Sequence, residues 1–191
     1  QGIIKVRVDN GFNMGIVVGT VDKNGSKFYS YGLRSKDGKE KVDEDTLFEV
    51  GSVTKLITST VLADMVVKKE LKLDDAAQTV FPENIKLPSL NDKHMTFKHL
   101  ATHYSGLPRM PGNLIPKDPA NPFKDYTVKD MYKFLTEYKL IHEPGKKYKY
   151  SNFAFGVLGH ALLLKGEKSY HDLVQERICE VLGMENTVVN M

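Results

Sequence analysis

The hydrophobic pattern of this sequence changes its period once, close to residue 50. Up to residue 34, apolar and polar side chains alternate in three short runs, IIKVRV, MGIVVGTV and KFYSYGL, with the turn-like stretches DNGFN and DKNGS between them. From residue 53 onward, apolar side chains recur at every third or fourth position, which is the helical period. Strands that are followed by helices predict an α+β fold.

The three N-terminal runs predict antiparallel strands joined by tight turns. Asn10-Gly11 and Asn24-Gly25 are strong hairpin signals, because both central residues of a type I′ turn need a positive φ. We therefore expect residues 1–50 to supply the N-terminal strands of a sheet and residues 51–191 to form a mainly helical part. At this length the two parts are expected to belong to a single domain, 1–191.

Several helices are expected in the second part. Residues 53 to 68 predict a central helix with one wide apolar face. Thr96 is expected to cap a short helix, and Thr127 opens a capping-box helix that runs to about residue 140. Two more helices are expected at about 153–165 and 170–182, each ended by a glycine, and Ser169 is expected to open the second. The wide apolar face of the central helix consists of Val53, Leu56, Ile57, Val61, Leu62, Met65 and Val66.

Charge and cysteine content exclude several classes of function. The 27 basic residues exceed the 24 acidic ones by only three and are scattered along the chain, so we expect no nucleic-acid partner. Cys179 is the only cysteine, which excludes an intramolecular disulfide and a cysteine-built zinc site. The longest apolar run, residues 153–164, is much shorter than the roughly 20 residues that a membrane-spanning helix needs.

His99 and His103 lie four residues apart on an expected helix, a spacing that lets two imidazoles share a metal ion. No third ligand is evident, and the glutamate of an H-E-x-x-H motif is absent. We therefore interpret both as surface or capping histidines, and we expect neither a metal nor an organic cofactor.

The first candidate for chemistry is the pair Ser52 and Lys55 in FEVGSVTKLIT. A serine hydroxyl is a weak nucleophile until a neighbouring base takes its proton, and a lysine can serve when its pKa is lowered towards neutrality. Residues three apart near a helix start share one face, so the two side chains can meet. Taken alone, S-x-x-K also occurs by chance, and a solvated lysine is then the simpler interpretation.

The second candidate is KYKYSNFAFG, in which Tyr150 and Asn152 lie where an extended piece meets an apolar helix. A tyrosine near a cation can ionise below its usual pKa and act as a general base, and an asparagine amide can donate to a substrate carbonyl. By itself the stretch is more simply interpreted as a loop in which Asn152 caps the helix.

Taken together, the motifs resemble those of the serine β-lactamase and penicillin-binding superfamily, and specifically of its class C branch, with family VIII carboxylesterases and D-stereospecific peptidases. Three stretches carry the resemblance: LFEVGSVTKLITSTVLADMVVKKELKLDD, FKHLATHYSGLP and EPGKKYKYSNFAFGVLGHALLLKGEKSYHDLVQERICEVLGMENT. The resemblance implies a β-lactamase/transpeptidase-like fold.

The resemblance also implies roles for four residues. Ser52 would be the acylated nucleophile, with its backbone N–H as half of an oxyanion hole, and Lys55 would help to deprotonate it. Tyr150 would be the general base that also serves the leaving group and the hydrolytic water. Asn152 would position Lys55 and the substrate amide. The implied activity is hydrolysis, through an acyl-enzyme, of a β-lactam, a D-alanyl peptide or a small ester.

The third motif of the family, Lys- or His-Thr/Ser-Gly on an edge strand, is not found in these residues. We therefore expect a C-terminally incomplete chain, without the remaining strands of the sheet, that self-associates through the incomplete sheet. The alternative to an active hydrolase is a noncatalytic or penicillin-sensing binding module, or an inactive fragment. Since the implied substrates are a small molecule or a peptide outside the cytoplasm, the expected location is periplasmic or extracellular.

Overall fold

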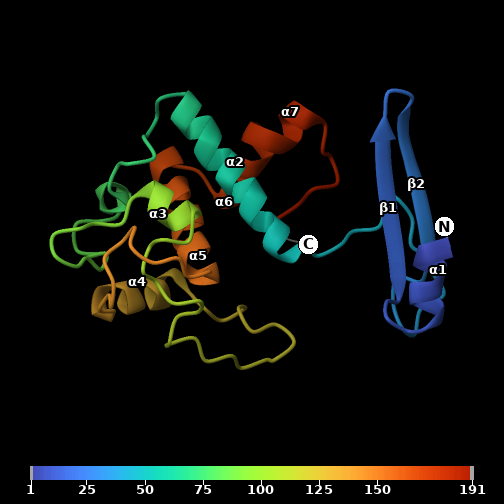
Figure 1. Cartoon of the computed structure of the whole chain (residues 1–191), viewed down its shortest axis with the longest axis horizontal. Coiled ribbons are helices and arrows are strands. Elements are labelled where there is room, and N and C mark those ends of the chain that lie inside the picture. Colours follow the sequence, from blue (N-terminus) through green and yellow to red (C-terminus); the bar gives the residue numbers. More distant parts are fainter. Residues whose placement is uncertain (1, 190–191) are drawn as a thin grey trace. The chain divides into compact units, whose positions relative to one another are not determined.

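The computed structural model describes residues 2–189, which form two compact units divided between residues 50 and 51 (Figure 1). The first unit contains one helix and a two-stranded sheet, and the second is helical. Among the described residues, no helix combines the length and the apolar character needed to cross a membrane.

The first unit is built around a β-hairpin. Strands β1 (Gly15–Asp22) and β2 (Gly25–Gly32) are antiparallel, in a register that pairs Gly15 with Gly32 and Asp22 with Gly25. The hairpin predicted at Asn24-Gly25 is therefore confirmed. The predicted type I′ turn is not formed. The two loop residues, Lys23 and Asn24, both have a negative φ, and only the following Gly25 has a positive φ, of 109°.

The strand predicted for IIKVRV is wrong, because these residues lie in helix α1 (Gly2–Asp9). The dipeptide Asn10-Gly11 accordingly ends a helix instead of turning a hairpin. Gly11 has a φ of 72°, its N–H bonds the carbonyl of Val8 at 2.9 Å, and the next N–H bonds the carbonyl of Arg7 at 3.0 Å. This is the Schellman pattern, in which a glycine accepts the left-handed conformation at a helix end.

Polar contacts favour a helix over the strand that the alternating pattern predicts. Lys5 and Asp9, one helical turn apart, form an ion pair at 2.8 Å. The hydroxyl of Tyr31 on β2 donates to Asp9 at 3.0 Å and accepts from Lys5 at 3.1 Å. A strand would place Lys5 and Asp9 about 13 Å apart, so only a helix brings both to one tyrosine. Alternation of β-branched residues is a context-dependent signal, and here it is overridden.

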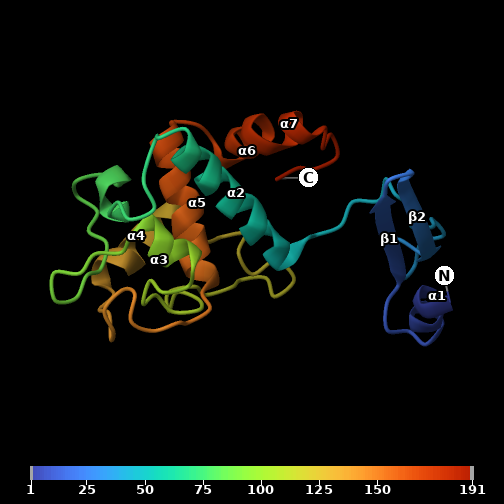
Figure 2. The ribbon, with the colours of Figure 1, turned by 45° about the horizontal axis from the view of Figure 1, so that its top comes forward.

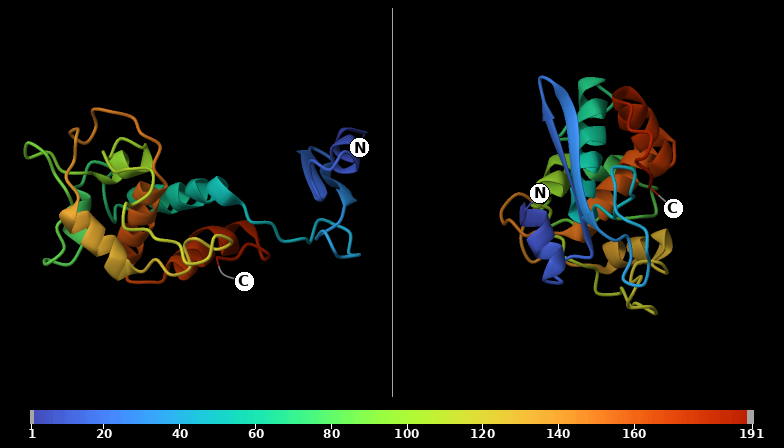
Figure 3. Two further views of the ribbon diagram at one scale, coloured as in Figure 1. Left: turned by 90° about the horizontal axis from the view of Figure 1, so that it is seen from below. Right: turned by 90° about the vertical axis from the view of Figure 1, so that its right-hand side faces the viewer.

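Helix α5 (Asn152–Gly166) is the centre of the second unit. It buries eight residues distributed around its circumference and contacts α2 (Thr54–Val67), α3 (Phe97–Ala101), α6 (Tyr170–Val174) and the 3₁₀ turn η2 (Ala77–Val80). Figures 2 and 3 show α2 and α5 side by side from further directions. A helix that is apolar on all sides belongs in an interior.

Caps read from the sequence are confirmed at three helix starts. Thr96 caps α3 in a capping box with His99, whose Nδ1 accepts the Thr96 N–H at 3.3 Å. Thr127 forms the same box with Asp130 at the start of α4 (Val128–Glu137), which ends three residues earlier than predicted. Ser169 caps the helical stretch expected over 170–182. That stretch consists of α6, a π-helical turn η3 (Gln175–Cys179) and α7 (Glu180–Leu182), followed by Gly183 at φ 65°.

The face predicted for the central helix is only partly buried. Val61, Leu62 and Met65 are buried on α2, whereas Val53 and Leu56 expose 57% and 65% of their surface. The helical period describes where apolar residues lie on a helix, but not how much of that face another element covers.

Candidate active site

Ser52 lies at the junction between a tight turn and helix α2. Gly51 has a φ of 52°, and residues 51–53 form the 3₁₀ turn η1 directly before Thr54 opens α2. The Ser52 side chain is exposed, and the half-buried Lys55 reaches back from the first turn of the helix. Lys55 Nζ donates to Ser52 Oγ at 3.1 Å. The predicted meeting of the two side chains is therefore observed.

Tyr150 completes a chain of three polar groups. Its hydroxyl shares a hydrogen bond of 2.8 Å with Ser52 Oγ, across 98 residues of sequence. An ammonium group can only donate, so the Ser52 oxygen accepts from Lys55 and its own proton can point to Tyr150. This geometry provides a path for a proton from Ser52 to Tyr150 along the hydrogen bond between them.

The charge around Tyr150 favours its phenolate. The pKa of Tyr150 lies below its ordinary value, first because of the neighbouring Lys55 ammonium and then because of the hydrogen bond with Ser52. Lys55 Nζ is 5.0 Å and the Arg109 guanidinium carbon 5.1 Å from the centre of the tyrosine ring. Cations near the phenol stabilise the charged form, as a general base requires.

The ring of His103 packs on Tyr150, with centroids 4.4 Å apart, and its Nδ1 accepts the N–H of Ser151 at 3.1 Å. Burial, and secondly the charge of Lys55, lower the pKa of His103, so the neutral imidazole that can accept at Nδ1 is favoured. His103 itself holds a φ of 65°, which is uncommon for a residue with a side chain. One imidazole thus fixes both the ring and the backbone beside it.

The serine of the Y-S-N motif caps helix α5. Ser151 is fully buried, accepts from the N–H of Ala154 at 2.8 Å and donates to the carbonyl of Pro108 at 2.6 Å. The backbone N–H of Asn152 bonds the carbonyl of Arg109 at 3.0 Å. The helix start is therefore bound to the loop that follows α3, and the interpretation of Asn152 as the cap is wrong.

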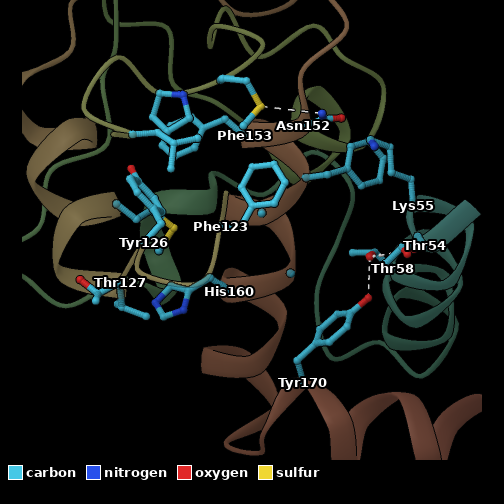
Figure 4. A pocket seen from close by; sticks show the side chains of 18 of the residues that line it. Thr54, Lys55, Thr58, Phe123, Tyr126, Thr127, Asn152, Phe153, His160 and Tyr170 are labelled. Atoms are coloured by element: carbon cyan, nitrogen blue, oxygen red, sulfur yellow. Dashed lines mark hydrogen bonds between the residues drawn. The ribbon is translucent and has the colours of Figure 1, made fainter. Parts of the chain in front are cut away.

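Asn152 lies near Lys55 without a hydrogen bond to it among the described residues. Both side chains line the same pocket (Figure 4). The Asn152 amide nitrogen lies 3.8 Å from the Met110 sulfur, and its Oδ1 is buried without a hydrogen-bond partner among the described residues. A buried acceptor without a partner is costly, so this oxygen is available to a donor that enters the site.

The sequence predicts Ser52, Lys55 and Tyr150, but not two of their neighbours. His103 is predicted only to be a surface or capping histidine, and no motif marks Arg109. Both flank the stretch YSGLP between α3 and the following loop, so their meeting with Tyr150 depends on the tertiary fold. Among residues 2–189, no group of three or more His, Cys, Asp or Glu side chains could hold a metal ion.

Comparisons with known proteins point to one family. A model described as beta-lactamase matches residues 2–191. The D-alanyl-D-alanine-carboxypeptidase/endopeptidase AmpH of Escherichia coli K12 is 33% identical over 174 residues, which is 91% of this chain and 44% of that protein. A beta-lactamase of Pseudomonas fluorescens is 28% identical over 181 residues, 93% of this chain and 46% of that protein.

The solved structures agree. A crystal structure of a beta-lactamase/D-alanine carboxypeptidase from Yersinia pestis has a TM-score of 0.88 and 29% identity, and the match covers 96% of this chain and 52% of that one. The chain therefore spans about half the length of the relatives it matches, and its fold is β-lactamase/transpeptidase-like. Since the family match extends over nearly all its residues, the chain belongs to the beta-lactamase family.

Proposed function

We propose that the chain carries the nucleophile and general base of a serine hydrolase of the class C type. The observation that supports this most directly is the hydrogen-bonded series Lys55, Ser52 and Tyr150, at 3.1 and 2.8 Å. It joins a nucleophile to a tyrosine whose pKa is lowered and to a fixed cation. Relatives named as beta-lactamases and as a D-alanyl-D-alanine carboxypeptidase support a hydrolytic reaction.

In the proposed reaction, Ser52 Oγ attacks a carbonyl carbon while its proton moves to Tyr150. The backbone N–H of Ser52, in the turn η1 directly before α2, would donate to the oxyanion that forms. Tyr150 then gives the proton to the leaving group, and the acyl-enzyme forms. In the second half-reaction Tyr150 takes a proton from water as the water oxygen bonds to the acyl carbon. The bond from that carbon to Ser52 Oγ then breaks, and Tyr150 returns the proton to Ser52 Oγ.

The proposed substrates are β-lactams, D-alanyl peptides or small esters. In each of them a carbonyl carbon bonded to a nitrogen or oxygen leaving group is open to a serine nucleophile. Asn152, with a free acceptor and an amide donor beside Lys55, would orient the group next to that carbonyl. A periplasmic or extracellular location would match these substrates.

Labelling of Ser52 tests the proposal. Incubation with a fluorophosphonate or a penicillin is expected to add the mass of the probe to a peptide containing Ser52. Ser52→Ala should abolish the adduct, and Tyr150→Phe should slow its formation by about 10²- to 10⁴-fold, the usual contribution of a general base. An adduct on another residue, or none on Ser52, would contradict the proposed nucleophile.

A penicillin-sensing module is the second candidate, because it shares the acylation step. Nitrocefin or p-nitrophenyl acetate separates the two. A burst followed by steady turnover supports the hydrolase, whereas a burst that stops at one equivalent supports the sensor.

We also propose that the chain self-associates. Val53 in η1 and Leu56 and Val67 on α2 expose between 57% and 79% of their surface. Exposed apolar side chains favour association, as do the unpaired edges of a two-stranded sheet. Light scattering over a wide range of concentrations should show a dimer or larger species, which Leu56→Lys weakens. A monomer at every concentration would contradict the proposal.

A further inference from the structure

His103 lies at a helix end in a conformation that favours glycine. Helix α3 ends in a Schellman motif, in which the N–H of Tyr104 bonds the carbonyl of His99 at 2.9 Å and His103 takes the left-handed position at φ 65°. Glycine is the usual residue there, followed by asparagine, because a Cβ strains this conformation. A strained residue is kept where its side chain has a use. The presence of an imidazole therefore points to a role beyond the helix end.

His103 binds the stretch around Tyr150 at two points. Its carbonyl accepts the N–H of Lys149 at 2.9 Å, and its Nδ1 accepts the N–H of Ser151 at 3.1 Å. The first contact uses only the backbone, which any residue supplies. The second depends on the side chain, and Ser151 is fully buried, so water does not replace a lost acceptor. Tyr150 lies between the two hydrogen bonds, and the imidazole therefore helps to set the backbone position from which its ring projects.

The imidazole also packs on the ring that it positions. The ring centres of His103 and Tyr150 are 4.4 Å apart at an interplanar angle of 38°, and Phe155 of α5 lies 5.0 Å from the imidazole centre. The Tyr150 hydroxyl is in turn 2.8 Å from Ser52 Oγ. A displacement of about 1 Å in a reacting group can slow a reaction about a hundredfold. Contacts that fix this ring therefore bear directly on the reactivity of Ser52.

A proton on His103 would remove the side-chain hydrogen bond. An imidazolium donates at both nitrogens and cannot accept the N–H of Ser151. Burial, and secondly the Lys55 ammonium, disfavour this charged form and lower the pKa of His103. The groups that face the imidazole are Lys55 from α2, Tyr148 and Tyr150 from the stretch before α5, with the Arg109 guanidinium against the Tyr150 ring, and Phe155 from α5.

We propose that His103 is a positioning residue for Tyr150 that works only as the uncharged imidazole, and that its protonation in mild acid suppresses the reactivity of Ser52. The inference rests on the proposed hydrolase function and adds regulation by pH to it. An imidazolium acting by charge alone would favour the phenolate and assist the base. Tyr150 is only partly buried, so solvent screens that charge, whereas the lost hydrogen bond to Ser151 is not restored. Displacement of the ring therefore dominates.

The pH dependence of Ser52 labelling by a fluorophosphonate tests this on the full chain. With Tyr150 as the only titrating group, the logarithm of the labelling rate falls towards low pH with a slope of about one. Below the pKa of His103, which lies under the ordinary histidine value of about 6.5, a second proton should make the slope about two. His103→Asn should keep a slope of about one, because asparagine tolerates the left-handed conformation and its Oδ1 accepts without titrating. A slope of about one in the unaltered chain overturns the inference.

Two further variants separate the role of the imidazole from that of its helix. His103→Gly suits the backbone but has neither ring nor acceptor, so labelling at neutral pH should slow by about tenfold to a hundredfold, and by more than in His103→Asn. An unchanged rate in His103→Gly would overturn the inference. His99→Gln is the matched control, because His99 also lies on α3, burial also lowers its pKa, and glutamine suits the same capping box. It should keep the slope of about two. Loss of that slope would assign the second proton to His99 and reject the role of His103.

A spectroscopic titration separates failure of this inference from failure of the proposed function. The amide signal of Ser151 and the ring ¹³C signals of Tyr150 should move with the midpoint of the His103 ¹³Cε1 signal, because one imidazole contacts both. The amide of Ala161, buried on α5, should not, and its movement with the same midpoint would show a wider transition and overturn the inference. Coupled shifts without any labelling of Ser52 would keep the positioning role and reject the hydrolase. Labelling without coupled shifts would keep the hydrolase and reject the positioning role.

Discussion

At the scale of single residues, the candidate site depends on how one tyrosine is held and charged. The ring of His103 and the side chains of Lys55 and Arg109 all lie within about 5 Å of the ring centre of Tyr150. The imidazole orients the ring, and the two cations favour its phenolate. A tyrosine in ordinary solution, with a pKa near 10, would be a poor base at neutral pH.

Removing either cation should raise the pKa of Tyr150 towards its ordinary value, because the phenolate loses a stabilising charge. Lys55 is the largest cause of the lowering and Arg109 a smaller one, so Lys55→Met should raise this pKa more than Arg109→Met. The ¹³Cζ shift of Tyr150 during a pH titration, assigned with Tyr150→Phe, measures it without any need for activity.

The same change has a kinetic consequence with a defined sign. If acylation requires the phenolate, its rate falls as the pH falls through the pKa of Tyr150, so a raised pKa moves this acid limb to higher pH. Arg109→Lys, which keeps the charge, should move it less than Arg109→Met. An unchanged Tyr150 pKa in Lys55→Met would contradict the electrostatic account.

Only part of this arrangement could be predicted from the residues themselves. Ser52 and Lys55 are three apart, so local geometry brings them together. Tyr150 was placed with them by the resemblance to a family, since no local rule joins residues 98 apart. His103 and Arg109 could not be assigned, because nothing in their surroundings in sequence says which ring they will contact.

At the scale of elements, helix starts were more predictable than strand assignments. Thr96, Thr127 and Ser169 all cap helices, because a side-chain oxygen followed by a helical pattern satisfies free N–H groups locally. Residues 2–9 are predicted as a strand, but they form a helix whose Lys5 and Asp9 both bond Tyr31 of β2. Propensity and alternation describe a segment, whereas the partner that decides its conformation can lie elsewhere in the chain.

Arg177 on η3 links two elements through a partly buried ion-pair network. It donates to Asp64 of α2 at 2.7 Å and to Glu70, in the segment after α2, at 2.9 Å, and only 15% of its side chain is exposed. Arg177→Met would leave two partly buried carboxylates without this partner. We expect the free energy of unfolding to fall by about 1–3 kcal/mol, measured by urea denaturation.

Lys168→Met is a matched control for that prediction. Lys168 pairs with Glu176, and both side chains are more than 40% exposed. Exposed pairs contribute about 0–1 kcal/mol, so this variant should remain close to the unaltered chain. Equal losses in the two variants would show that burial of the Arg177 network does not matter for stability.

At the scale of the whole molecule, the hydrophobic core is divided very unequally between the two units. The main cluster of buried side chains runs from Val61 to Cys179, entirely within the second unit. Among residues 2–50, Val42 is the only buried apolar residue, and much of the hairpin is exposed. Ser52 and Tyr150, the proposed nucleophile and general base, both belong to the unit that holds the core.

This division predicts different behaviour when the units are produced separately. Residues 51–191 should unfold in a single cooperative urea transition, because their core is internal to the unit, and Ser52 should keep its hydrogen bond to Tyr150. Residues 1–50 should show no such transition, since a two-stranded hairpin with almost no buried surface is marginally stable in water. Far-UV circular dichroism during urea titration follows the unfolding of each piece. A cooperative transition in residues 1–50, or its absence in residues 51–191, would show that stability is not governed by the core identified in the second unit.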